Sequence, residues 1–128
     1  MDPRIKRLAK LLIVHDQLKS LHEARRAGFL EAQAQAGAEA AALIRRFDEP
    51  DSLSGLFPEL YHARIEAAWT REAEQRALAE EEARRLAALT LREKRIAEEL
   101  ETLRAAAERA SAERAALEWV EARLLAKS

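Results

Sequence analysis

Proline and glycine are confined to a few positions of this chain, and their placement limits what it can fold into. The three prolines stand at positions 3, 50 and 58. The stretch FDEPDSLSGLFPE, from Phe47 to Glu59, holds two of them and one of the three glycines. The 70 residues after Pro58 contain neither residue type and are mostly strong helix formers. The sequence therefore predicts two long helices and a single break.

The ends of both predicted helices carry recognisable signals. Asp2 can cap the first helix, and Pro3 suits the first helical position, where a missing N–H costs nothing. Pro50 disfavours helical geometry at the residue before it, and Pro58 can open the second helix. We predict one domain over residues 1–128, with a helix over 3–47, a bend over 48–58 and a helix over 59–126. Gly28 and Gly37 are expected to lie inside the first helix, each at a cost of about 1 kcal/mol relative to alanine.

Both helices show apolar residues at the spacing of a coiled coil. The second helix has a stripe that recurs every seven residues at Leu89, Ile96, Leu103, Ala110, Leu117 and Leu124. The first helix has a matching stripe at Leu11, Val14, Leu18 and Leu21, which slips by one residue after Gly28 to continue at Phe29, Ala36 and Leu43. Sustained heptads predict that the two helices bury these stripes against each other.

The fold class expected from this pattern is all-α: two long helices in an antiparallel coiled-coil hairpin with a projecting C-terminal helix. At 1.5 Å per residue the first helix is about 68 Å long and the second about 100 Å. The second helix beyond Leu103 therefore has no intramolecular mate, although its apolar stripe continues. An apolar side chain left in water forgoes about 1.5–3 kcal/mol, so this overhang is expected to bind a partner.

The start of the first helix also carries more apolar surface than one pairing can bury. Ile5, Leu8 and Leu12 form one stripe, and Leu11, Val14 and Leu18 form another beside it. Surplus apolar surface marks an interaction site. The predicted protein-binding residues combine the first stripe, its basic neighbours and the end of the second helix: Arg4, Ile5, Arg7, Leu8, Lys10, Leu12, Trp119, Val120 and Leu124.

Several kinds of chemistry find no support in the sequence. The chain has no cysteine, no glycine-rich phosphate loop and no strand to carry a nucleophile elbow. His15 and His22 share a helix face, but a metal site needs more ligands than this pair. We expect no catalytic residues, no metal and no cofactor, and hence not an enzyme. The net charge of −1 and the absence of a recognition motif argue against nucleic acid.

No stretch of the sequence approaches the roughly 20 apolar residues of a membrane span. At most, the basic amphipathic start RIKRLAKLLIVHDQLK makes peripheral contact with an anionic membrane surface. The apolar run in this segment is also too short for the core of a signal peptide. The expected location is cytoplasmic.

The segments RIKRLAKLLIVHDQLKSLHEARRAGFLEAQAQ and LREKRIAEELETLRAAAERASAERAALEWVEARL, on either side of a bend, resemble the FliJ/YscO family. That family comprises small coiled-coil hairpins of flagellar and type III export machines. The resemblance implies a central stalk that enters the hexameric ring of the export ATPase and reaches toward the export gate. It also implies a role in protein transport, by coupling or activating the ATPase ring and the gate.

Two other readings stay open. One is a self-associating coiled-coil scaffold, in which the overhang pairs with a second copy to make a homodimer. The other is a small export chaperone that shelters a helix of a secreted protein. Flagellar and virulence secretion systems are not distinguished by the sequence.

Overall fold

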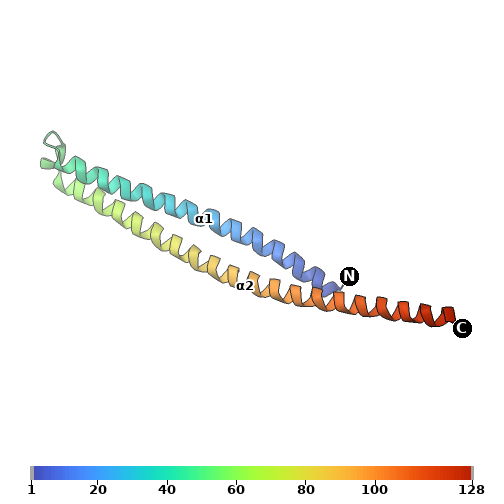
Figure 1. The fold of residues 1–128 in the computed structure, drawn as a ribbon. Helices are drawn as coiled ribbons and strands as arrows, with labels where there is room; N and C mark the ends of the chain where they lie inside the picture. The colour runs from blue at the N-terminus through green and yellow to red at the C-terminus, as the bar shows by residue number, and fades with distance from the viewer. Residues whose placement is uncertain (1, 128) are drawn as a thin grey trace. The chain divides into compact units, whose positions relative to one another are not determined.

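Two long helices make up nearly all of the chain. The computed structural model describes residues 2–127, which form α1 (Pro3–Asp48), a short 3₁₀ turn η1 (Leu53–Gly55) and α2 (Pro58–Lys127) (Figure 1). The two long helices pack together, and no strand occurs among the described residues. Each helix ends within one residue of its predicted limits, since α1 runs one residue further and α2 begins one residue earlier and ends one later.

Side-chain caps close both ends of α1. At its start, the Asp2 carboxylate accepts a hydrogen bond from the amide N–H of Arg4 at 2.9 Å. At its end, the Ser54 hydroxyl donates to the carbonyl of Phe47 at 2.7 Å. The last carbonyls of a helix have no partner within the helix, so this bond satisfies one of them. Pro50 stands just beyond, and η1 then leads the chain into Pro58, the first residue of α2.

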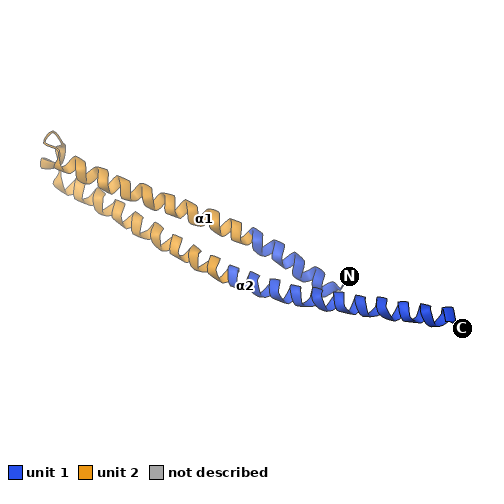
Figure 2. Cartoon of the chain, in the orientation of Figure 1, with its two compact units in different colours: residues 1–17, 90–128 blue, residues 18–89 orange. Residues whose placement is uncertain are grey.

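The described chain divides into two compact units, which are treated separately (Figure 2). Of the described residues, unit 1 contains 2–17 and 90–127, and unit 2 contains 18–89. Each unit therefore holds a part of α1 and a part of α2.

Small side chains fill the interior of unit 2. Four alanines there are no more than 4% exposed: Ala36, Ala40, Ala68 and Ala79. A β-carbon at Gly37 would lie 3.5 Å from the side chain of Glu72, so this glycine faces the other helix closely. Gly28 meets open space instead. The distance between two packed helix axes depends on the side chains at the contact. The alanines and Gly37 therefore allow α1 and α2 to approach each other closely in unit 2.

The buried residues of unit 1 are two large apolar side chains, and one ion pair joins its two segments. Ile5 is 7% exposed and Leu100 is 3% exposed. The guanidinium of Arg4 donates to the carboxylate of Glu99 at 2.6 Å. The last partly shielded residue of α2 is Leu103, and every residue from 104 to 127 is exposed.

One face of α2 has shielded residues at alternating spacings of three and four, as heptads require. It contains Tyr61, Ile65, Ala68, Glu72, Gln75, Ala79, Glu82, Leu86, Leu89, Glu93, Ile96, Leu100 and Leu103. Glu81 and Ala83, on either side of Glu82, are also partly shielded. The apolar stripe predicted through Leu89, Ile96 and Leu103 coincides with this face. Burial ends at Leu103, although the repeat continues in the sequence.

The shielded face of α1 differs from the predicted one. It passes through Ile5, Leu8, Leu12, His15, Lys19, His22, Phe29, Gln33, Ala36, Ala40, Leu43 and Phe47. The stripe predicted at Leu11, Val14, Leu18 and Leu21 is 38–52% exposed. Because His22 and Phe29 are seven residues apart, the face keeps one register across Gly28, and the predicted one-residue slip does not occur. The prediction favoured an all-apolar stripe, whereas the buried stripe includes two histidines and a lysine.

Candidate protein-binding surface

The C-terminal part of α2, residues 104–127, is a helix with no cover among the described residues. All of its side chains are exposed, and we call it the exposed segment. Its large apolar side chains are 45–75% exposed: Leu117, Trp119, Val120, Leu124 and Leu125. Apolar side chains gathered on one exposed helix mark a surface for interaction rather than a core.

The apolar side chains of the exposed segment continue the stripe that is buried earlier in α2. Leu117 and Leu124 stand 14 and 21 residues after Leu103, which is two and three heptads. Val120 falls between them at spacings of three and four, so the three side chains share one face. This face has the spacing that a second helix needs in order to pack against it.

Trp119 lies on a different face of the exposed segment. It is two residues from Leu117, which is about 200° around a helix of 3.6 residues per turn. The guanidinium of Arg123 sits 4.8 Å from the centre of the Trp119 ring, in a cation–π contact. The side chain is still 59% exposed. Trp119 therefore extends the apolar surface of this segment beyond the Leu117 face.

The apolar residues predicted at the start of α1 take a different role from the one expected. Ile5 is buried, and Leu8 and Leu12 are partly shielded. They lie on the face of α1 that the fold covers, so the expectation that this stripe is free surface is corrected. The exposed large apolar residues of α1 include those of the neighbouring stripe, together with three others: Leu11, Val14, Leu18 and Leu21, and Ile13, Leu30 and Ile44.

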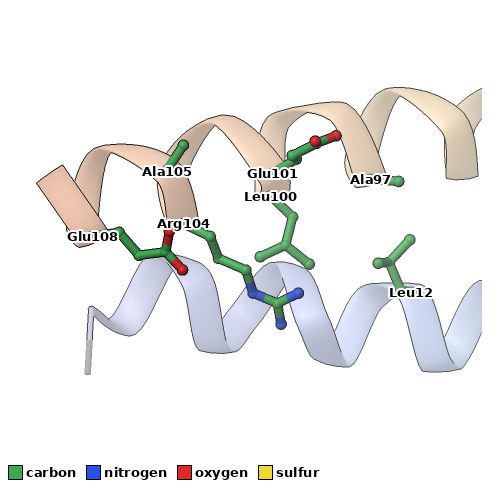
Figure 3. A pocket seen from close by; sticks show the side chains of 7 residues that line it. All are labelled: Leu12, Ala97, Leu100, Glu101, Arg104, Ala105 and Glu108. Carbon is green, nitrogen blue, oxygen red and sulfur yellow. The ribbon is translucent and has the colours of Figure 1, made fainter.

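Leu12 also lines an open hollow of about 460 Å³ in unit 1 (Figure 3). Leu12 of α1 and Leu100 of α2 point toward one another across it, and Arg104 extends from α2 toward α1 (Figure 3). The hollow is mixed in chemistry, because Glu101, Arg104 and Glu108 line it beside the leucines. It lies where the last shielded turn of α2 gives way to the exposed segment.

The three predicted basic residues are all exposed, and they differ in what they contact. Arg4 is held by Glu99 across unit 1. Arg7 and Lys10 make no ion pair within residues 2–127. These two side chains are therefore the part of the predicted basic rim that remains available to a partner.

A buried carboxylate in unit 2 was not predicted. Glu82 is 1% exposed. One of its oxygens lies 2.5 Å from Nδ1 of His22. The other lies 3.3 Å from Arg25 and 3.1 Å from Arg85. Extending the repeat of Leu89 and Ile96 back by one heptad reaches position 82, so the spacing alone could have located it.

The environment of Glu82 keeps it charged. Burial raises the pKa of this carboxyl, because it removes water from the anion. The hydrogen bond with His22 and the charges of Arg25, His22 and Arg85 act the other way and prevail. The net pKa lies below the ordinary value of 4.5. Because Glu82 of α2 pairs with His22 and Arg25 of α1, the cluster joins the two helices.

The three histidines occupy structural positions. The Nδ1 atom of His15 is 2.9 Å from the carbonyl of Leu11, one turn earlier in α1. His22 pairs with Glu82. The ring of His62 packs against Phe47 with centroids 5.2 Å apart, a contact that the sequence did not indicate.

Neither a metal site nor a membrane span is found in the part of the chain that the structure covers. Residues 2–127 contain no group of three His, Cys, Asp or Glu side chains placed to hold a metal ion. Within the same range, no helix has both the length and the apolar character needed to cross a bilayer.

Comparison of the chain with protein-family models, with curated proteins and with solved structures found no match. The case for a function therefore depends on the surfaces described above and on the sequence pattern.

Proposed function

We propose that this protein is a non-enzymatic coiled-coil adaptor that binds a partner through its exposed segment. In the proposed architecture, α1 and α2 form an antiparallel hairpin, and residues 104–127 project from it as a single helix. Two contacts of unit 2 support the antiparallel order, because Glu39 pairs with Arg71 while the earlier His22 pairs with the later Glu82. In an antiparallel pair, residues earlier in one helix contact residues later in the other, and these two ion pairs follow that order.

The observation that carries the proposal is the uncovered heptad face of the exposed segment. Leu117 and Leu124 are 62% and 64% exposed, although they continue a stripe that is buried or partly shielded up to Leu103. Each of these side chains stands to gain about 1.5–3 kcal/mol on full burial. A partner that supplies an apolar groove or a second helix recovers this free energy.

We further propose that the partner is the ATPase hexamer of a flagellar or type III export machine, in the cytoplasm. The resemblance to the FliJ/YscO family supports this assignment, and a single exposed helix suits entry into a narrow ring. The role is that of a central stalk, which activates the ATPase ring and couples it to the export gate. Arg7 and Lys10, which are exposed and make no ion pair with another residue of 2–127, supply basic contacts near the start of α1.

The test is the ATP hydrolysis rate of an export ATPase with and without the full chain. Leu117→Glu and Leu124→Glu place charges on the heptad face, and we expect each to weaken stimulation by about tenfold or more. Ser111→Glu is the matched control, because position 111 is exposed, lies about 120° or more around the helix from Leu117 and Leu124, and is about two turns from Trp119. Equal stimulation by wild type and both leucine variants would refute docking through this face.

Self-association is the second candidate, and the same heptad face favours it. A second copy could cover Leu117 and Leu124 by pairing exposed segments. Sedimentation equilibrium at micromolar concentration separates the two functions. The adaptor is expected to sediment at the chain mass of 14.4 kDa, and a mass twice as large would favour the scaffold.

A further inference from the structure

A group of exposed apolar side chains surrounds the bend in unit 2, and the adaptor function proposed above makes no use of it. Leu53 is 57% exposed and Leu56 is 74% exposed. Phe57 and Leu60, at the start of α2, are 53% and 52% exposed. These four residues lie within eight positions of the chain. An apolar cluster of this kind on a surface marks a site of interaction.

Part of this cluster forms a hollow of about 300 Å³. Leu53, Phe57 and Leu60 line one part of it, and Leu43 of α1 contributes a further apolar side chain. Two cations, Arg46 and Arg64, also line the hollow, and no carboxylate does. The hollow therefore combines an apolar surface with positive charge.

The two arginines differ in how far their charges are already neutralised. Arg46 donates to the carboxylate of Glu49 at 2.8 Å. Arg64 makes no ion pair within residues 2–127. Its neighbours at helical spacings of three and four, on both sides, are all uncharged: Leu60, Tyr61, Ala67 and Ala68. Arg64 is therefore the group in the hollow that still lacks an anion.

We propose that this hollow is a second docking surface, which binds an acidic amphipathic helix of a partner protein. A leucine-sized side chain of that helix enters between Leu53, Phe57 and Leu60, and a carboxylate on the adjacent turn pairs with Arg64. Amphipathic helices bind grooves in this way, through apolar anchors one turn apart. The carboxylate sets the orientation and the choice of partner more than the affinity.

The charges around the bend favour such a helix over a lipid surface. Four acidic residues lie between positions 48 and 59, namely Asp48, Glu49, Asp51 and Glu59. A flat anionic membrane would meet these carboxylates together with the apolar cluster, and like charges repel. A helix seated in the hollow meets its lining, which contains two arginines and no carboxylate.

The test uses the full chain, labelled with ¹⁵N, and two synthetic amphipathic peptides. The first peptide has leucines at helical spacings of three and four with glutamates on its other faces, and the second replaces each glutamate by lysine. We expect the acidic peptide to shift the amide resonances of residues 43–64 and to bind about fivefold more tightly than the basic one. Equal affinity of the two peptides, or shifts confined to other residues, would overturn the proposal.

Two variants and two controls assign the contact to named residues. Arg64→Glu is expected to lower the affinity for the acidic peptide about fivefold, since it reverses one exposed charge. Arg84→Glu changes another exposed arginine of α2 in unit 2, which does not line the hollow, and is expected to have no effect. Leu60→Asp is expected to lower the affinity for both peptides about tenfold or more, because it places a charge in the apolar part of the hollow.

Leu117→Glu, in the exposed segment, should leave peptide binding unchanged, which separates this surface from the one used by the adaptor. Unaltered binding by Arg64→Glu would refute the charge pairing. A preference of the chain for anionic vesicles, with no competition from the acidic peptide, would assign the surface to lipid and refute the proposal.

Discussion

Glu82 occupies a position on α2 where heptad spacing calls for an apolar side chain. Its burial is tolerated because Arg25, Arg85 and His22 surround both of its oxygens. A buried charge without such partners is strongly destabilising, whereas a paired one can specify which residues face each other. We interpret the cluster as a device that selects one register of the two helices in unit 2.

The lowered pKa of Glu82 makes part of the folding stability depend on pH in the acidic range. Because this pKa lies below 4.5 in the folded protein, the folded state holds the proton less readily than the unfolded chain. The contribution is therefore fully present above pH 4.5 and is lost as the pH falls through the lowered pKa. We expect the Tm, measured by circular dichroism between pH 6 and pH 3, to fall in this acidic range.

Glu82→Gln should reduce the stability at pH 6 and flatten the profile below pH 4.5, because the amide cannot titrate. Glu81→Gln is the control, since Glu81 pairs with Arg85 at the surface and its side chain is 45% exposed. A Glu82→Gln profile with the same slope as wild type would contradict the assignment of the acid transition to Glu82.

At the scale of an element, the two helices differ in how well their faces could be predicted. The buried face of α2 passes through Leu89, Ile96 and Leu103, all apolar, so periodicity alone located it. On α1 a purely apolar stripe at Leu11 and Val14 competed with the true one. The true face was missed because its polar members are satisfied by contacts across the fold, as His22 is by Glu82, and a single sequence does not show such pairings.

The bounds of both helices were predictable for a different reason. Proline acts locally, through a missing N–H and a fixed backbone angle, so Pro50 and Pro58 mark the break without knowledge of the fold. The contact of Phe47 with His62 and the hydrogen bond from Ser54 to the Phe47 carbonyl are not local in this sense. They depend on the path of the bend, and the sequence pattern did not indicate them.

The small residues of unit 2 lead to a prediction for the packing of its helices. Ala68 is 0% exposed, so a larger side chain there has no space to occupy. We expect Ala68→Leu to lower the free energy of unfolding by about 1–3 kcal/mol, as overpacking does in other cores. Ala67→Leu is the matched control, because Ala67 is exposed, and it should change stability by less than about 0.5 kcal/mol. Urea denaturation measures both, and equal effects would show that Ala68 is not tightly packed.

For the molecule as a whole, the main physical consequence is that burial is distributed unevenly along α2. Up to Leu103 a shielded residue recurs every three or four positions, and from 104 onward every residue is exposed. Helical stability in proteins comes mostly from packing of one face, and in residues 104–127 no face is shielded by the described chain. The exposed segment therefore depends on a partner to become as stable as the rest of α2.

Amide hydrogen exchange tests this dependence directly on the full chain. Without a partner, the amides of residues 104–127 should exchange readily, as those of a fraying helix end do. Those of residues 65–103 should be protected, because they exchange only when the packed helices unfold. Addition of the binding partner should slow exchange in 104–127 and leave 65–103 largely unchanged. Strong protection of 104–127 in the isolated chain at low concentration would mean that the protein covers this segment itself. Protection that rises with the concentration of the chain would instead show that a second copy is the partner, because only that interaction follows mass action in the protein alone.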